Sequence, residues 1–254
     1  MSKLPKEHQF IDLSDYGRPI AKFIANSLKS TSFTPIHVTI AFIISGFVAI
    51  YCMIMGYYWS AAFFLIFKSI LDAADGELAR VKQKPSYTGR YLDSVADIIL
   101  NALFLITIWY ITNISIWLCL LAFIGLQLQG TLYNYYYVIL RNRFDGDTTS
   151  RVFEDKTPVA LEGEKQQHVT ILFGLYRVLY GLFDEVIYSI DRNADKGSIL
   201  PNWLMTSVST FGLGFQLLVI AILLVLGLKA IIIPFFLLYT FMIFVFVGIR
   251  KIFY

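Results

Sequence analysis

The segment from Lys68 to Leu100 reads KSILDAADGELARVKQKPSYTGRYLDSVADIIL, and it joins two strongly apolar stretches of the chain. Four aspartates stand at the ends of those stretches: Asp72, Asp75, Asp93 and Asp97. An ionised carboxylate beside hydrocarbon is energetically costly, so acids in this position indicate a functional site. Because hard divalent cations prefer carboxylate oxygens, a metal ion is the simplest partner for these charges.

The composition of the whole chain is that of a membrane protein. Of its 254 residues, 57% are apolar and only 15% are charged, and the mean hydropathy is +0.64. Soluble domains carry about 25% charged residues. The net charge of +3 is small and argues against a nucleic-acid partner. Cys52 and Cys119 lie far apart in apolar runs, so neither a disulfide framework nor a zinc site is indicated.

Apolar segments long enough to cross about 30 Å of hydrocarbon recur along the sequence. We therefore expect an all-α integral membrane protein, with six transmembrane helices in a single membrane domain covering residues 1–254. The expected spans are 35–55, 59–80, 93–111, 116–140, 201–227 and 230–248. Residues 34–140 would thus hold the first four spans, and 201–254 the last two. The bases and Pro85 in residues 81–90 predict a loop.

Two polar segments are expected to lie on the membrane surface rather than to cross it. Residues 1–33 mix apolar and basic positions, which favours an interfacial amphipathic helix over a soluble tail. Residues 141–200 form a long cytoplasmic or interfacial insertion between the fourth and fifth spans. Within it, 168–191 is helical in pattern and carries one polar stripe, which indicates an interfacial helix and not a seventh span. The stripe consists of Thr170, Arg177, Asp184 and Asp191.

The distribution of basic residues predicts the orientation of the spans. Nearly all lysines and arginines fall in the N-terminal segment, in 81–90, in 141–201 and at the C-terminal end, whereas the opposite turns contain only Lys229. Since basic residues favour the cytoplasmic side, both termini and the aspartates are expected there. In a bacterium the membrane would be the plasma, or inner, membrane.

The spacing of the aspartates predicts a metal site between two helices. Asp72 and Asp75 are three residues apart, and Asp93 and Asp97 are four apart, so each pair lies on one helical face. Two such faces turned toward each other would form a cage for a hard cation, or for a pair of Mg²⁺ or Mn²⁺ ions. Lys68, one turn before Asp72, could pair with it or extend toward the lipid headgroups.

The residues between the aspartates favour a phosphorylated ligand. Gly76, Ala79 and Gly89 lack bulk, so a ligand could approach the backbone there. Arg80 is suited to bidentate contact with phosphate oxygens. Acids for a metal, small residues for close approach and an arginine for phosphate together indicate phosphoryl-type chemistry.

Residues 72–97 match the pattern D-x2-D-G-x2-A-R-x8-G-x3-D-x3-D at every fixed position, and the segment resembles the signature of the CDP-alcohol phosphotransferase family. The resemblance implies an enzyme that transfers a phospho-alcohol from a CDP-linked donor to a hydroxyl and releases CMP. It also implies a homodimer whose helices surround a cavity open to the cytosolic leaflet.

Carried over by position, the resemblance also assigns roles to the matched residues. Asp72, Asp75 and Asp93 would ligate metal, Asp97 would complete the metal site, and catalysis would rest on Asp93 and on Asp97 as the base. The CDP pocket would be lined by Gly76, Ala79, Arg80 and Gly89.

The match is incomplete outside this segment. Family members often carry T-P-N-x-x-T before the first span. Here Thr34, Pro35 and Thr39 fit, but Ile36 replaces the asparagine, so this segment is left out of the candidate site. The E-E-Y-H-T-G run of eukaryotic choline and ethanolamine enzymes is missing, which favours CDP-diacylglycerol as donor and a small alcohol as acceptor.

Three alternatives stay open. A CDP-aminoalcohol could be the donor, with diacylglycerol as the acceptor. A transporter could use buried acids, although it would be expected to place them at the membrane midplane rather than at the cytoplasmic edge. An inactive scaffold would be expected to show a degraded motif, and here no fixed position is lost.

Overall fold

The computed structural model describes residue 4, residues 8–144 and residues 156–254, and within these it is helical without strands. Part of the predicted insertion, residues 145–155, lies outside the described residues. The helices are α1 (Arg18–Leu28), α2 (Pro35–Ile54), α3 (Tyr58–Lys82), α4 (Tyr87–Thr112), α5 (Ile116–Arg143), α6 (Gln166–Ile190), α7 (Asn202–Val208), α8 (Leu213–Val225), α9 (Ile232–Thr240) and α10 (Met242–Phe253), with short 3-10 turns η2 (Leu13–Asp15), η3 (Ser209–Phe211) and η4 (Lys229–Ile231).

Four helical stretches in the described part are long and apolar enough to cross a membrane: α2, α4, α5 and Lys229–Phe253. A fifth arises if Asn202–Phe211 and α8, which meet at a bend of 56°, are counted as one span. The second predicted span, α3, does not qualify because Lys68, Asp72 and Asp75 interrupt its apolar surface. Several long apolar helices therefore make this a multi-pass membrane protein.

The outward face of α2 shows why these helices suit lipid. Ile40, Ile44, Phe47 and Tyr51 follow one another at helical spacing, and each is 47–58% exposed. A continuous apolar stripe of this kind would be unfavourable in water and is expected against hydrocarbon. The opposite face of α2 is buried against α3 and α4.

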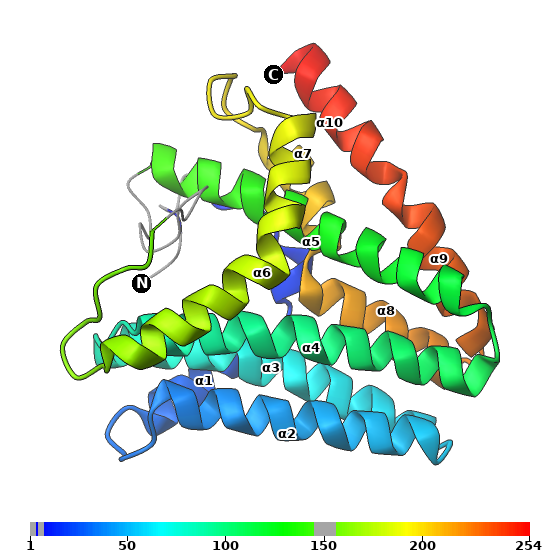
Figure 1. The fold of residues 1–254 in the computed structure, drawn as a ribbon, viewed down its shortest axis with the longest axis horizontal. Coiled ribbons are helices and arrows are strands. Elements are labelled where there is room, and N and C mark those ends of the chain that lie inside the picture. Colours follow the sequence, from blue (N-terminus) through cyan, green and yellow to red (C-terminus); the bar gives the residue numbers. More distant parts are fainter. Residues whose placement is uncertain (1–3, 5–7, 145–155) are drawn as a thin grey trace.

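The helices α2, α3 and α4 form the layer that carries the candidate site, and they run along the long axis of the molecule in Figure 1. Gly46 of α2 lets α4 approach closely, because a Cβ atom built there would lie 2.8 Å from the methyl carbons of Leu100. The turn between α2 and α3 contains Gly56 at φ +77°, a conformation that glycine adopts without strain. On the other side, α3 packs against α1 and α8.

The predicted loop at residues 81–90 is shorter in the structure. The helix α3 continues to Lys82 and is capped by Gln83 in the left-handed conformation, and Ser86 then caps α4. The prediction was wrong here because serine at an N-cap ends the loop four residues early. As a result, Gly89 lies in the first turn of α4 and not in a loop.

The segment 201–227 is not one straight span, because its helix breaks at Gly212, where the backbone is extended (φ −71°, ψ 152°). The turn η2 fills the bend: Ser14 Oγ accepts from the backbone N–H of Gly214 at 3.1 Å. Within 1–33 the structure has the helix α1, with Ala21 and Ala25 buried and Phe23 72% exposed. Its place on the membrane surface stays a prediction.

The predicted helix at 168–191 is present as α6, which crosses obliquely in front of α4 and α5 in Figure 1 and packs against both. One member of its polar stripe was misplaced, since Asp191 is fully buried and forms an ion pair with Arg250 of α10. Tyr136 of α5 also donates to Asp191 Oδ2, at 2.7 Å. Asp191 therefore joins three helices instead of facing the membrane surface.

Candidate active site

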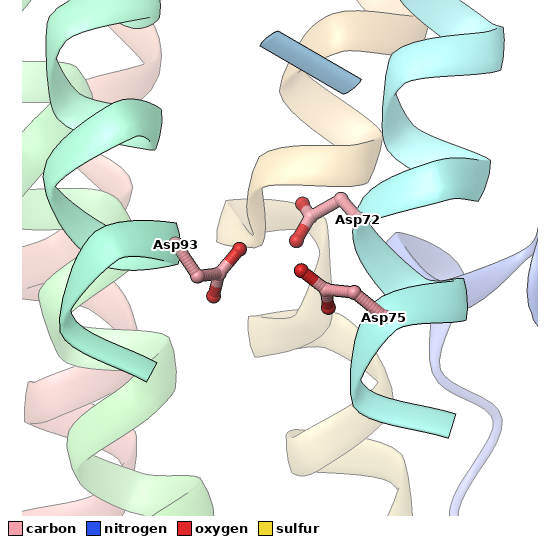
Figure 2. Close-up of side chains that lie close together, drawn as sticks. All are labelled: Asp72, Asp75 and Asp93. Atoms are coloured by element: carbon pink, nitrogen blue, oxygen red, sulfur yellow. The ribbon is translucent and has the colours of Figure 1, made fainter. Parts of the chain in front are cut away.

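Three of the four aspartates converge between α3 and α4. Asp72 and Asp75 project from one face of α3, and Asp93 projects toward them from the first turns of α4 (Figure 2). One oxygen from each carboxylate lies within 4.8 Å of the other two. Asp93 Oδ1 is buried and has no hydrogen-bond partner among the described residues. Carboxylate oxygens at this separation, one of them unsatisfied, fit the ligand set of a hard divalent cation.

The helix α2 contributes a residue that the sequence reasoning left out. Thr39 Oγ1 donates to Asp75 Oδ2 at 2.6 Å, and both side chains are buried, with 1% and 8% exposed. A hydrogen bond of this kind fixes the orientation of a carboxylate that could ligate metal. The incomplete T-P-N-x-x-T match was the available signal, because Thr39 is its last position.

Asp97 does not belong to this group of three, and its carboxylate pairs instead with a lysine side chain. One turn beyond Asp93 on α4, its Oδ1 accepts from the ammonium of Lys68 in a close ion pair. The same ammonium lies 3.2 Å from Asp72 Oδ2. Lys68 therefore pairs with Asp72, which was one of the two roles predicted for it. In addition, it links α3 to α4.

Arg80, which is predicted to bind phosphate, forms an ion pair with an acid on its own helix. Glu77, only 3% exposed, binds Arg80 Nη2 at 3.0 Å and Arg18 Nη1 of α1 at 2.6 Å. The Nε of Arg80 is buried and has no partner within the described residues. A Cβ atom built on Gly76 would face this guanidinium at 3.6 Å, so the two residues border the same space.

The other two small residues of the motif lie at helix ends. The N–H of Gly89 donates to Ser86 Oγ at 2.8 Å, and a Cβ atom at Gly89 would come within 3.3 Å of that oxygen. Ala79 lies one turn before the end of α3, and its carbonyl accepts from Lys84 N at 3.1 Å. The structure thus gives both residues a part in the helix caps, and their contact with a nucleotide stays a prediction.

A comparison with known protein families gives a match over the region that contains these residues. The family model for CDP-alcohol phosphatidyltransferase matches residues 33–163, about half of the sequence. The chain belongs to the CDP-alcohol phosphatidyltransferase family. A search of curated proteins gives no match. Family membership makes the protein a phosphotransferase that uses a CDP-alcohol, within phospholipid biosynthesis and a membrane lipid environment.

The region matched by the phosphatidyltransferase model ends one residue before Glu164, which the sequence reasoning missed entirely. The carboxylate of Glu164 accepts from the hydroxyl of Ser86 at 2.7 Å and from the backbone N–H groups of Tyr87 at 3.2 Å and Thr88 at 2.7 Å. Burial alone would raise the pKa of Glu164, but these hydrogen bonds outweigh burial and lower it. A carboxylate at the N-terminus of α4 also interacts favourably with the helix dipole.

The helix α6 supports the same end of α4 in this phosphatidyltransferase. Tyr180 donates to the backbone carbonyl of Ser94 at 2.9 Å, and the ring of Tyr91 packs against Phe173 and Tyr176. The residues of α4 that make these contacts, Tyr91 and Ser94, lie on either side of Asp93 in the sequence. No short motif predicts them, because they join segments about 80 residues apart in the chain.

Proposed function

We propose that this enzyme transfers the phosphatidyl group of CDP-diacylglycerol to the hydroxyl of a small polar alcohol, releases CMP, and depends on a divalent metal. The convergence of Asp72, Asp75 and Asp93 carries the proposal, because it offers a cation site. Arg80, five residues after Asp75 on α3, would add a phosphate-binding group at the same end of this helix. The missing E-E-Y-H-T-G run supports this donor over a CDP-aminoalcohol, whose acceptor would be diacylglycerol.

The carboxylates of Asp72, Asp75 and Asp93 would hold the metal, Mg²⁺ or Mn²⁺, since oxygen-rich sites favour hard cations. When bound, the metal would supply positive charge that neutralises the diphosphate of the donor and the departing CMP. The unsatisfied Oδ1 of Asp93 supports this assignment. A second ion, with Asp97 among its ligands, is part of the same hypothesis.

Arg80 would bind phosphate oxygens of the donor, with Glu77 orienting its guanidinium. Gly76, Ala79 and Gly89 would allow the nucleotide to approach the backbone. Asp97 would accept the proton of the alcohol while the alcohol oxygen bonds to the phosphorus and the bond from phosphorus to CMP breaks. The proton thus ends on Asp97, and the electron pair of the broken bond leaves with CMP.

For the membrane arrangement we propose six spans, with both termini and the active site cytoplasmic, and a homodimeric assembly. In this arrangement α3 crosses the membrane despite its charges, because Lys68 and Asp72 face other helices and pair with each other. The concentration of basic residues on one side of the expected spans supports the orientation. The plasma membrane would be the location in a bacterium.

The test is CMP release by the purified protein, measured with a panel of CDP-linked donors and acceptor alcohols in the presence of Mg²⁺ or Mn²⁺. The variants Asp93→Asn and Asp97→Asn should abolish release while remaining folded in detergent. As a matched control, Asp195→Asn alters an exposed aspartate and should leave release unchanged. Turnover at the wild-type rate by either active-site variant would refute the assignment, and release only from CDP-aminoalcohols would favour the alternative donor.

A further inference from the structure

Lys68 has an unusual position for a lysine in a membrane protein. Its side chain is fully buried, with 0% exposed, in the interior between three helices. The ammonium contacts Asp97 across the interface to α4 and Asp72 on its own helix, at 3.2 Å. It also lies 4.5 Å from the centre of the Phe42 ring on α2, in cation–π geometry.

The charges around this lysine do not balance without a cation. Four aspartates carry a formal charge of −4, and Lys68 supplies +1, which leaves −3 in the α3–α4 interface. Buried like charges repel strongly because little water screens them. A fixed ammonium between Asp72 and Asp97 reduces this repulsion and joins the two helices that carry the carboxylates.

The same contacts divide the aspartates into two sets. Asp72, Asp75 and Asp93 form the group that could hold a metal, whereas Asp97 is engaged by Lys68. Asp72 belongs to both sets, because it is a member of the metal group and its Oδ2 also accepts from Lys68. A divalent ion that enters the site must therefore share these acids with an ammonium already in place.

We propose that Lys68 is a built-in counter-cation of the phosphotransferase site. It positions Asp97, stabilises the pairing of α3 with α4 before metal binds, and competes with the metal for Asp72 and Asp97. This inference rests on the proposed metal-dependent function. Lys68 acts through the aspartates, and it is a positioning residue rather than a catalytic one.

The proposal predicts opposite effects of Lys68→Met on two measurements. Methionine keeps the length of the side chain and removes its charge. In detergent with chelator, the variant should unfold at a lower temperature than the wild type, because Asp72 and Asp97 lose their partner. Its affinity for Mn²⁺, measured by electron paramagnetic resonance, should rise by about tenfold or more, because a competing positive charge is gone.

Two further variants keep the result interpretable. Lys229→Met is the matched control: like Lys68, Lys229 contacts an aromatic residue, donating to the hydroxyl of Tyr58 of α3 at 2.9 Å, but these contacts include no aspartate of the site. It should change neither measurement. If Lys68→Met alone fails to fold, the double variant Lys68→Met/Asp97→Asn removes both ends of the ion pair and should recover metal-free stability.

The possible outcomes separate this inference from the proposed function. A wild type that binds Mn²⁺ and releases CMP, with Lys68→Met binding Mn²⁺ no more tightly, overturns competition by Lys68 and leaves the function intact. Unchanged metal-free stability in Lys68→Met, or a double variant no more stable than the single one, overturns its role as a counter-cation. A wild type that neither binds Mn²⁺ nor releases CMP overturns both proposals.

Discussion

Thr39 allows a direct test of the hydrogen bonds around the carboxylates. The substitution Thr39→Val keeps the branched shape of the side chain but removes the hydroxyl that donates to Asp75 Oδ2 at 2.6 Å. Both side chains are buried, so water cannot readily replace the lost donor. A hydrogen bond to a charged group contributes about 1.5–3 kcal/mol, which corresponds to about 10- to 150-fold in a rate or equilibrium constant.

The assay combines CMP release with Mn²⁺ binding by purified protein in detergent. Because residues that hydrogen-bond to metal ligands tune both affinity and turnover, kcat/KM and Mn²⁺ affinity should each fall by about 10- to 150-fold in Thr39→Val. Thr107→Val is the matched control: this buried hydroxyl of α4 donates at 2.8 Å to the carbonyl of Leu103 in its own helix. Its removal should leave both constants unchanged.

The reasoning is refuted if Thr39→Val binds Mn²⁺ and turns over within about threefold of the wild type, since a hydrogen bond of the stated strength would then be absent. A fall in thermal stability with both constants preserved would also contradict it, because Thr39 would then serve the packing of α2 alone.

Two other substitutions separate stability from function. Gly76→Ala should raise the stability of the fold by about 0.5–1 kcal/mol, since alanine favours helices and its Cβ atom meets nothing nearer than Arg80 at 3.6 Å. Its KM for the CDP-linked donor should nevertheless rise, because the methyl group enters the space in front of the guanidinium; an unchanged KM would contradict this. Glu164→Gln should lower the melting temperature at pH 7. Because the folded-state pKa of Glu164 lies below its ordinary value of 4.5, its contribution is present above that value and is lost as the pH falls through the lowered pKa. The difference from wild type should therefore shrink on acidification, and a difference independent of pH would exclude the carboxylate as its cause.

The sequence was sufficient to predict the helices and the acids, because both depend on local patterns. Long apolar runs predicted α2, α4 and α5, and the spacing of the aspartates predicted that α3 and α4 face each other. The break at Gly212 was missed, because the whole of 201–227 was interpreted as one apolar run although Ser207, Ser209 and Thr210 precede the glycine. It depends on η2, about 200 residues earlier in the chain, which fills the bend through Ser14.

The partners of the site residues were harder to predict for the same reason. Glu77 lies within the motif and Lys68 lies one turn before it, yet their contacts with Arg18 and Asp97 require the packing of α3 against α1 and α4. Glu164 caps α4 from beyond the family-matched region, 77 residues from Tyr87. A spacing rule covers one helix, and these contacts are made between helices.

The aspartates of the site differ in how many hydrogen bonds and ion pairs their carboxylates make, and this difference bears on the need for a metal. Asp75 accepts a hydrogen bond from Thr39, and Asp72 shares the ammonium of Lys68 with Asp97. Asp93 Oδ1 is buried without a partner among the described residues. Since an unsatisfied buried carboxylate oxygen is costly, the charge of Asp93 creates the strongest demand for an added cation. The ion that meets this demand would lie between α4 and α3, and in the proposed function it would act together with Arg80 on the phosphates of the donor. On this proposal, the cost of burying Asp93 would be offset only when the metal and the donor bind.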